Sequence, residues 1–358
     1  MPSEVDLLNT FATEIRSGLD EILFTDPRAI LMGLGVTDPK GVFGTTLGLY
    51  EKYGSKRVIE TPTSENSITG IGVGLAITGY RPIMVHQRQD FFLLAMDQLV
   101  NSAAKWHYMF GGQQSVPITI RLITGRGWGQ GPTHSQNLHS WFAHIPGLKV
   151  VMPAFARDAK NLLKESVNDP NPVIFIEDRW CHMQNVENSV DGKNKQATIG
   201  HGEVIVNGND LTIVAAGFST IQSYRAVKCI QNQGVSIELI DLKTIKPLDI
   251  SIITKSIQKT GKLLVVDSGT AISSFGSEII SQVSKLAFDS LKIAPEMITA
   301  PDIPEPASYG VTGAFKFDSR DIALKVLEIV DKDQFHFDLS GLVDVPHDVP
   351  HATFKGPF

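Results

Sequence analysis

The chain has 358 residues, of which 42% are hydrophobic and 20% charged. At roughly 150 residues per domain this predicts two folded domains and excludes a disordered or fibrous chain. The net charge of -6 argues against a nucleic acid or an anionic membrane as partner, and the two cysteines, Cys181 and Cys229, exclude both a disulfide framework and a cysteine-rich zinc site.

The chain opens with an amphipathic pattern. Apolar residues recur every three to four positions from Leu7 to Leu23, which predicts a helix. This stretch is acidic and has no continuous apolar core, and no run of roughly 18 apolar residues occurs in the sequence. We therefore expect no secretory signal, no membrane span and a cytoplasmic location.

Short β-rich runs then alternate with helical patterns, which predicts an α/β fold of mainly parallel sheets covered by helices. The polar stretch over 184–202 lacks periodicity and is typical of a linker. We expect a first domain over 1–183, a second, smaller α/β domain over 203–340 and a tail over 341–358. The main predicted helices span 47–53, 67–78, 92–109, 156–168, 221–233, 248–260, 275–288 and 320–330.

Glu65 follows the predicted strand RVIET and stands at the start of an apolar, glycine-rich helix. Two interpretations compete for its carboxylate. It either complements the positive end of the helix, which contributes about 0.3–1 kcal/mol, or exchanges a proton with a ligand at the carboxyl edge of a parallel sheet. The segment by itself favours the first interpretation.

Two further segments carry polar groups after predicted strands. The run HQRQDFF, residues 86–92, suits a polar ligand beside a flat ring, or else is a solvated loop leading into a helix. The segment TGRGWGQGPTHSQ, residues 124–136, is rich in glycine and ends near His134, as in a mobile loop that closes over a site. The nearby histidines lack the carboxylate or cysteine pattern of a zinc site. The glycines of GLGV and GIGVG match no phosphate-binding sequence, and those of GIGVG, which begins inside a predicted helix, favour helix packing.

Several stretches resemble one family in order and spacing: GVFGTTLGLYEKYGSKRVIETPTSE, GIGVGLAITGYRPI, AMDQLVNSAAK, THSQNLHSWFAHIPGLKVVMP, DAKNLLKESVNDPNPVIFIE and DLKTIKPLD. The chain is similar, from about Asp20 to Val330, to the β subunit of the thiamine diphosphate-dependent first component of 2-oxo acid dehydrogenase complexes. This family is itself similar to the pyrimidine and carboxy-terminal domains of transketolase. The resemblance therefore implies the two-domain transketolase-like fold.

Matched residue by residue, the resemblance implies that Glu65 hydrogen-bonds the aminopyrimidine ring of thiamine diphosphate and activates it by supplying a proton. Phe91 would stack on that ring with Gln87 beside it, and His134 would face the substrate. His86 and Arg88 become candidate substrate contacts, because a polar, basic lining suits a hydroxylated or anionic ligand. The resemblance also implies a potassium site, for which the alternative is an ordinary helix end; its candidates are Ile118, Ser166, Asp169 and Asn171.

The chain contains no GDG motif with a following asparagine to hold the diphosphate and its Mg²⁺. In the family that motif belongs to an α subunit, so the resemblance implies an αβ or α2β2 assembly. The implied activity is decarboxylation of a 2-oxo acid and transfer of the acyl or aldehyde fragment, as in pyruvate dehydrogenase. Two alternatives stay open: a transketolase-like transferase acting on a sugar or polar aldehyde, and a non-catalytic assembly subunit.

One departure bears on the site. Leu34 and Gly35 stand where the family's dehydrogenases usually have an acidic pair after the first strand. The resemblance places that pair near the pyrimidine-binding glutamate. Its absence favours an altered proton relay between paired sites.

Overall fold

The computed structural model describes residues 10–184, 197–332 and 336–342. The predicted helix start at Leu7, most of the predicted linker and most of the predicted tail lie outside these residues. The chain divides into two compact units, which are described one at a time. Unit 1 holds the described residues of Met1–Gly125 and Trp141–Ile199, and unit 2 holds those of Arg126–Ser140 and Gly200–Ala352.

Unit 1 is built on a parallel sheet whose strands run in the order β5-β6-β4-β3-β1-β2. Strand β4 is buried at every residue, as its apolar sequence leads one to expect. The strands are β1 (Ala29–Gly33), β2 (Val58–Glu60), β3 (Arg81–His86), β4 (Thr119–Thr124), β5 (Lys149–Val151) and β6 (Val173–Asp178).

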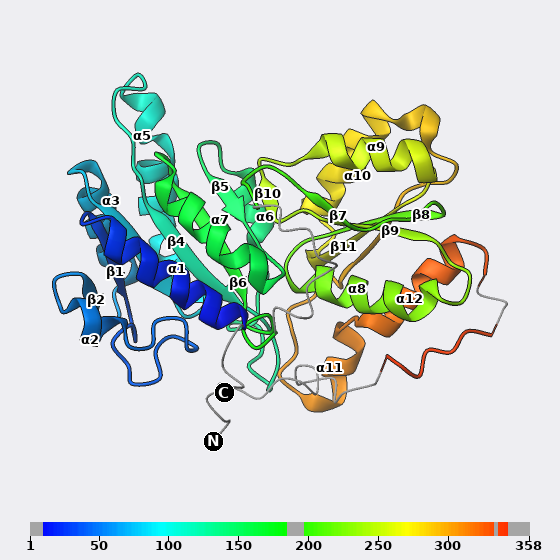
Figure 1. The fold of residues 1–358 in the computed structure, drawn as a ribbon, viewed down its shortest axis with the longest axis horizontal. Helices are drawn as coiled ribbons and strands as arrows, with labels where there is room; N and C mark the ends of the chain where they lie inside the picture. Colours follow the sequence, from blue (N-terminus) through cyan, green and yellow to red (C-terminus); the bar gives the residue numbers. More distant parts are fainter. Residues whose placement is uncertain (1–9, 185–196, 333–335, 343–358) are drawn as a thin grey trace. The chain divides into compact units, whose positions relative to one another are not determined.

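Helices cover this sheet, and the apolar core lies between the helices and the sheet. Figure 1 shows α1 and α7 side by side over the sheet, where Gly18 of α1 lets Lys160 and Leu163 of α7 approach closely. Helix α7 buries one face because its apolar residues recur with helical spacing. The helical segments of this unit are α1 (Phe11–Thr25), α2 (Leu49–Tyr53), α3 (Glu65–Ile77), α4 (Gln89–Phe92), α5 (Ala104–Met109) and α7 (Ala156–Asn168). Helix α6 (His139–His144) has its first two residues in unit 2 and the rest in unit 1.

The predicted continuous helix over 92–109 is wrong in detail. A 3₁₀ turn at Leu93–Ala95 and a π-helix at Gln98–Ala103 separate α4 from α5. The apolar spacing still indicates a helix, but the backbone hydrogen bonds change from one register to another along it. Such π segments occur frequently beside functional sites.

Unit 2 contains a sheet in the order β12-β11-β8-β9-β7, in which only the edge pair β7–β9 is antiparallel among the described strands. Within this unit, Figure 1 shows α8 and α12 on one face and α9 and α10 on the other. The elements are β7 (Glu203–Val206), β8 (Leu211–Ala215), α8 (Phe218–Gln231), β9 (Ile237–Asp241), β10 (Thr244–Lys246), α9 (Ile250–Thr260), β11 (Leu263–Thr270), α10 (Phe275–Leu286), β12 (Glu296–Ala300), α11 (Tyr309–Phe315) and α12 (Ser319–Ile329).

The predicted fold class is confirmed, because both units are mainly parallel sheets covered by helices. Within the described residues, no helix combines the length and the apolar character needed to cross a membrane. The predicted domain boundaries stay predictions.

Candidate functional site

A small pocket lies at the carboxyl edge of the unit 1 sheet, where β1, β2 and β3 end. Parallel strands place the residues that follow them at one edge, the usual location of ligand sites in such sheets. The pocket holds a volume of about 20 Å³, little more than one water molecule needs. Its walls are formed by Leu34, Pro62, Thr63, Glu65, Ile68, Val85, His86, Gln87 and Phe91.

Glu65 is the first residue of α3 and is half-buried. Within the described residues its carboxylate makes no hydrogen bond and no ion pair. The side chain of Ser64, the N-cap residue, makes no capping bond either. The glutamate therefore offers a free carboxylate to the pocket, next to the positive end of a helix dipole.

Phe91 and Gln87 form another part of the wall. Phe91 remains 37% exposed, and an aromatic ring of this kind can stack on a flat ligand. Gln87 donates from Nε2 to the Leu34 carbonyl at 3.2 Å. Gly35 is required beside it, because its φ is +77° and a Cβ there would lie 2.6 Å from Gln87 Nε2.

His86 is buried on the same wall, with its ring edge-on to Phe92 at 4.8 Å between centroids. Its Nε2 is buried and has no hydrogen-bond partner within the described residues. Burial lowers the pKa of His86 to about 4, so the imidazole is neutral near pH 7. The wall therefore includes an uncharged imidazole with a buried nitrogen that has no partner within the described residues.

Arg88, a predicted substrate contact, does not line this pocket. Its guanidinium is buried and donates to the Gly125 carbonyl at 2.8 Å. Burial lowers the pKa of Arg88, while Asp90 and Asp178 oppose that change. The side chain thus bonds to the residue that follows β4 and is not part of the pocket wall.

His134 lies in the segment Arg126–Ser140, which belongs to unit 2. It is half-buried, and its Nδ1 lies 3.0 Å from Thr133 Oγ1. Glu65, His86, Gln87 and Phe91 belong to unit 1. The structure therefore groups these four around one pocket and describes His134 in a different unit.

The residues predicted to bind potassium already have partners. The Ile118 carbonyl accepts from Val173 N at 3.0 Å, and Ser166 Oγ donates to the Leu162 carbonyl at 2.6 Å. The Asp169 carboxylate pairs with Lys149 and accepts from Asn171 N at 2.9 Å. In the described part of the chain, no group of three or more His, Cys, Asp or Glu residues could hold a metal ion.

Sequence reasoning missed a carboxylate that shapes the pocket rim. Glu60 accepts from Gly35 N at 2.6 Å, from Thr37 N at 3.1 Å and from Thr37 Oγ1 at 2.9 Å. It closes the loop after β1, where the usual acidic pair is absent. The sequence did contain a signal for Glu60, because this residue is next to last in the predicted strand RVIET. In the structure it is the partner of Gly33 where β2 pairs with β1.

It also missed a buried network behind the sheet edge. Arg121 on β4 donates to Glu177 on β6 from Nε at 2.5 Å and from Nη2 at 2.8 Å, and also to Thr45 at 2.9 Å. His182 Nε2 lies 3.2 Å from Glu177. Burial opposes ionisation of Glu177, but Arg121 and His182 outweigh it and lower its pKa to about 2. The sequence signal for this network was a charged residue within each of two predicted strands, β4 and β6, that are otherwise free of charge up to Thr124 and Glu177.

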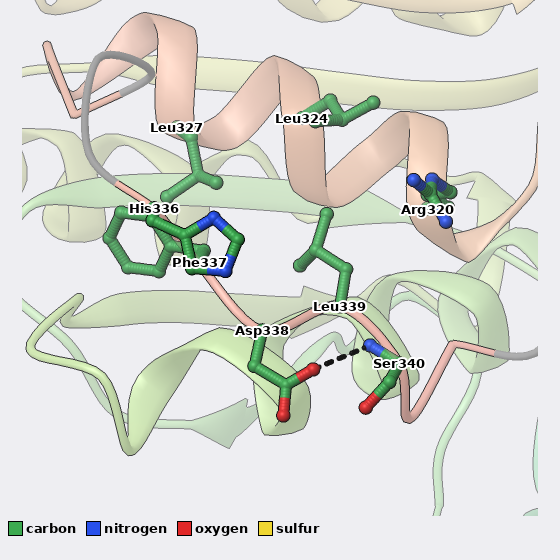
Figure 2. A pocket seen from close by; sticks show the side chains of 8 residues that line it. All are labelled: Arg320, Leu324, Leu327, His336, Phe337, Asp338, Leu339 and Ser340. Atoms are coloured by element: carbon green, nitrogen blue, oxygen red, sulfur yellow. Dashed lines mark hydrogen bonds between the residues drawn. The ribbon is translucent and has the colours of Figure 1, made fainter.

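A larger hollow of about 480 Å³ lies in unit 2 between α12 and the segment His336–Ser340 (Figure 2). Leucine side chains from both segments line it, and Asp338 accepts from Ser340 N at 2.9 Å at its edge. It contains none of the predicted site residues, so the pocket at Glu65 remains the candidate site.

Comparison with known proteins identifies the family. Residues 10–181 match the transketolase pyrimidine-binding domain, and residues 200–322 match the transketolase C-terminal domain. The chain is 37% identical over 327 residues to the mitochondrial pyruvate dehydrogenase E1 component subunit beta of Dictyostelium discoideum, covering 88% of this chain and 91% of that protein. The chain belongs to the pyruvate dehydrogenase E1 β-subunit family. The resemblance stated from the sequence is thereby confirmed.

A second relative agrees with this assignment. The E1 component subunit beta of Rhizobium meliloti (strain 1021) is 39% identical over 298 residues, which cover 83% of this chain and 64% of that relative's length. A solved structure titled "Split gene transketolase, inactive beta4 tetramer" superposes with a TM-score of 0.73 at 18% identity, covering 91% of this chain and 99% of that one. This second likeness bears on the fold alone.

Proposed function

We propose that the chain is the β-type subunit of a thiamine diphosphate-dependent enzyme of the pyruvate dehydrogenase type. In this proposal the enzyme decarboxylates a 2-oxo acid and transfers the resulting acyl or aldehyde fragment in the cytoplasm. The observation that carries it is the pocket lined by the partly exposed Phe91 and by Glu65, whose carboxylate has no partner within the described residues. Family membership supports the same activity.

The chemical groups of the pocket fit the pyrimidine half of the cofactor. The partly exposed Phe91 would stack on the ring, and His86 Nε2 is a buried polar atom without a hydrogen-bond partner in the described part of the chain. Glu65 would hold a proton at the ring nitrogen and exchange it during the reaction. When bound, thiamine diphosphate supplies the carbon nucleophile and the electron sink that decarboxylation needs.

Two further residues complete the proposed chemistry. Gln87 would lie beside the cofactor ring, fixed by its bond to the Leu34 carbonyl. His134 would hold or donate a proton at the substrate. Arg88 is given no contact with the substrate in this proposal, because it lies outside the pocket wall and donates to the Gly125 carbonyl.

The diphosphate requires a second subunit in this proposal. The sequence has no GDG motif for the diphosphate and its Mg²⁺, and the pocket volume of about 20 Å³ is too small to enclose a pyrimidine ring. We infer that an α-type subunit supplies the other wall in an αβ or α2β2 assembly. Potassium is left out of the proposal, because the Lys149 ammonium already pairs with the Asp169 carboxylate.

We expect the isolated chain to bind thiamine diphosphate weakly, and the chain with its α-type partner to bind it at least about 100-fold more tightly, a difference of roughly 2.7 kcal/mol. The physical reason is that the charged diphosphate finds its ligands on the partner. Isothermal titration with and without Mg²⁺ measures this. Tight, magnesium-dependent binding to the isolated chain would contradict the assignment of a half-site.

Product analysis of the reconstituted pair tests the reaction. We expect decarboxylation of a 2-oxo acid with transfer to lipoamide, measured by released CO₂ and acylated acceptor. The neutral polar wall of His86 and Gln87 favours, as a second candidate, transfer to a sugar or polar aldehyde, so sugar aldehydes are assayed in parallel. If an assembly that binds the cofactor forms no product with either class of acceptor, the proposal is overturned. The chain would then have only a role in assembly.

A further inference from the structure

The segment Arg126–Ser140, which carries His134, is held within unit 2 by a buried hydrogen bond between a histidine and an aspartate. His139 Nε2 donates to Asp267 Oδ1 at 2.9 Å, and the two residues are 1% and 0% exposed. Asp267 lies in β11, the strand between β8 and β12. One end of the segment is therefore tied to an interior strand of the sheet, next to its edge strand β12.

The surroundings of Asp267 make this pair difficult to replace. Its Oδ1 also accepts from Gly269 N at 2.7 Å, whereas Oδ2 is buried and has no partner within the described residues. His139 is therefore the only side chain of the described part that donates to this carboxylate. Removing one partner of a buried pair leaves the other unsatisfied, which costs far more than losing a surface pair.

Neighbouring contacts hold the same end of the segment. Asn137 Nδ2 donates to the Ser268 carbonyl at 3.2 Å, and Ser140 Oγ accepts from Phe275 N at 3.0 Å. The His139 ring also packs edge-on against Phe275, with 5.3 Å between centroids. Three successive contacts to β11 and the start of α10 thus fix the backbone after His134.

The other end of the segment is held separately. The Arg126 guanidinium lies 5.7 Å and 5.9 Å from the ring centroids of Phe315 and Phe317. Gly131 packs so closely on Ala307 that a Cβ there would lie 3.2 Å from the Ala307 Cβ. His134 therefore lies between two anchored ends of a glycine-rich segment.

We propose that Asp267 and His139 are positioning residues, which hold the segment Arg126–Ser140 in the conformation that presents His134 to the substrate. The inference rests on the role given to His134 under the proposed function. Misplacing a reacting group by about 1 Å can cost about 100-fold in rate. The pocket at Glu65 belongs to unit 1, so cofactor binding should not depend on this pair.

The test uses the reconstituted assembly with three variants, Asp267→Ala, His139→Ala and His139→Gln, in which the glutamine amide retains a donor. We expect hydrogen exchange in peptides from 126–140 to become about tenfold faster in the two alanine variants. We expect kcat to fall about 10- to 100-fold, while the Kd for thiamine diphosphate changes less than about twofold. His139→Gln should restore most of the slow hydrogen exchange in 126–140 and most of kcat.

The matched control is Ser256→Ala, which removes another buried polar contact of unit 2, the 2.6 Å bond to Thr212. This variant should leave exchange in 126–140 and kcat unchanged. Unchanged exchange in His139→Ala would overturn the anchoring role, and faster exchange with unchanged kcat would overturn the positioning role. The variant His134→Ala is assayed beside them, because full activity in it would refute the proposed role of His134 whatever the exchange data give.

Discussion

Glu65→Gln is expected to lower kcat of the assembled enzyme by about 10²- to 10⁴-fold, the range typical of losing a positioned acid or base. Glutamine keeps the shape of the side chain but cannot supply a proton to the cofactor ring. The carboxylate has no partner within the described residues, so the change breaks no internal bond. Steady-state turnover with saturating cofactor measures the effect.

Folding and assembly should survive this substitution. Loss of the charge at the start of α3 costs about 0.3–1 kcal/mol at most, so Tm should fall by only a few degrees. Asn66→Ala, at the exposed next residue of the same helix, is the control and should retain full turnover. Substantial activity in Glu65→Gln would refute the assignment of this residue.

Glu177→Gln is expected to destabilise the chain by about 3–5 kcal/mol, because it leaves the fully buried Arg121 without its counter-charge. Lys52→Met is the matched control. It breaks the ion pair between Lys52 and Asp20, whose side chains are 52% and 37% exposed, and such pairs contribute about 0–1 kcal/mol. Urea unfolding at pH 7 measures both. If both variants lose the same small amount of unfolding free energy, the buried network does not stabilise the fold.

The same network predicts a pH dependence. The folded-state pKa of Glu177, about 2, lies below the ordinary value of 4.5. Its contribution, on the order of 3 kcal/mol, is therefore complete above pH 4.5 and is lost as the pH falls toward 2. Unfolding measured from pH 6 to pH 3 should reveal this loss in the wild type and not in Glu177→Gln. If the unfolding free energy falls equally with pH in the wild type and in Glu177→Gln, Glu177 is not the source of the pH dependence.

Much of the fold was predictable because local patterns dominate it. The apolar spacing gave α7 its observed limits, 156–168, and the β-rich runs located the buried strands. The short helices α6 and α11 were missed, since six or seven residues carry too little periodicity. The π-helix at Gln98–Ala103 was missed as well, because its residues carry no signal that distinguishes it from an α-helix.

The site was predictable only where its residues follow strand ends. Glu65, His86, Gln87 and Phe91 could be named from sequence, and they line one pocket, although their roles stay predictions. The links from Arg121 to Glu177 and from His139 to Asp267 join residues 56 and 128 positions apart. Such pairs depend on strand order and on tertiary packing, which no local pattern contains.

The anchoring of Arg126–Ser140 in unit 2 has a consequence for protein engineering. A chimera joined at the polar stretch over 184–202 would combine this segment from one parent with β11 from the other. His139 would then face a foreign residue in place of Asp267, even though both parental domains were intact. Recombination within this family should therefore transfer residues 126–140 together with the second domain, as a discontinuous cassette.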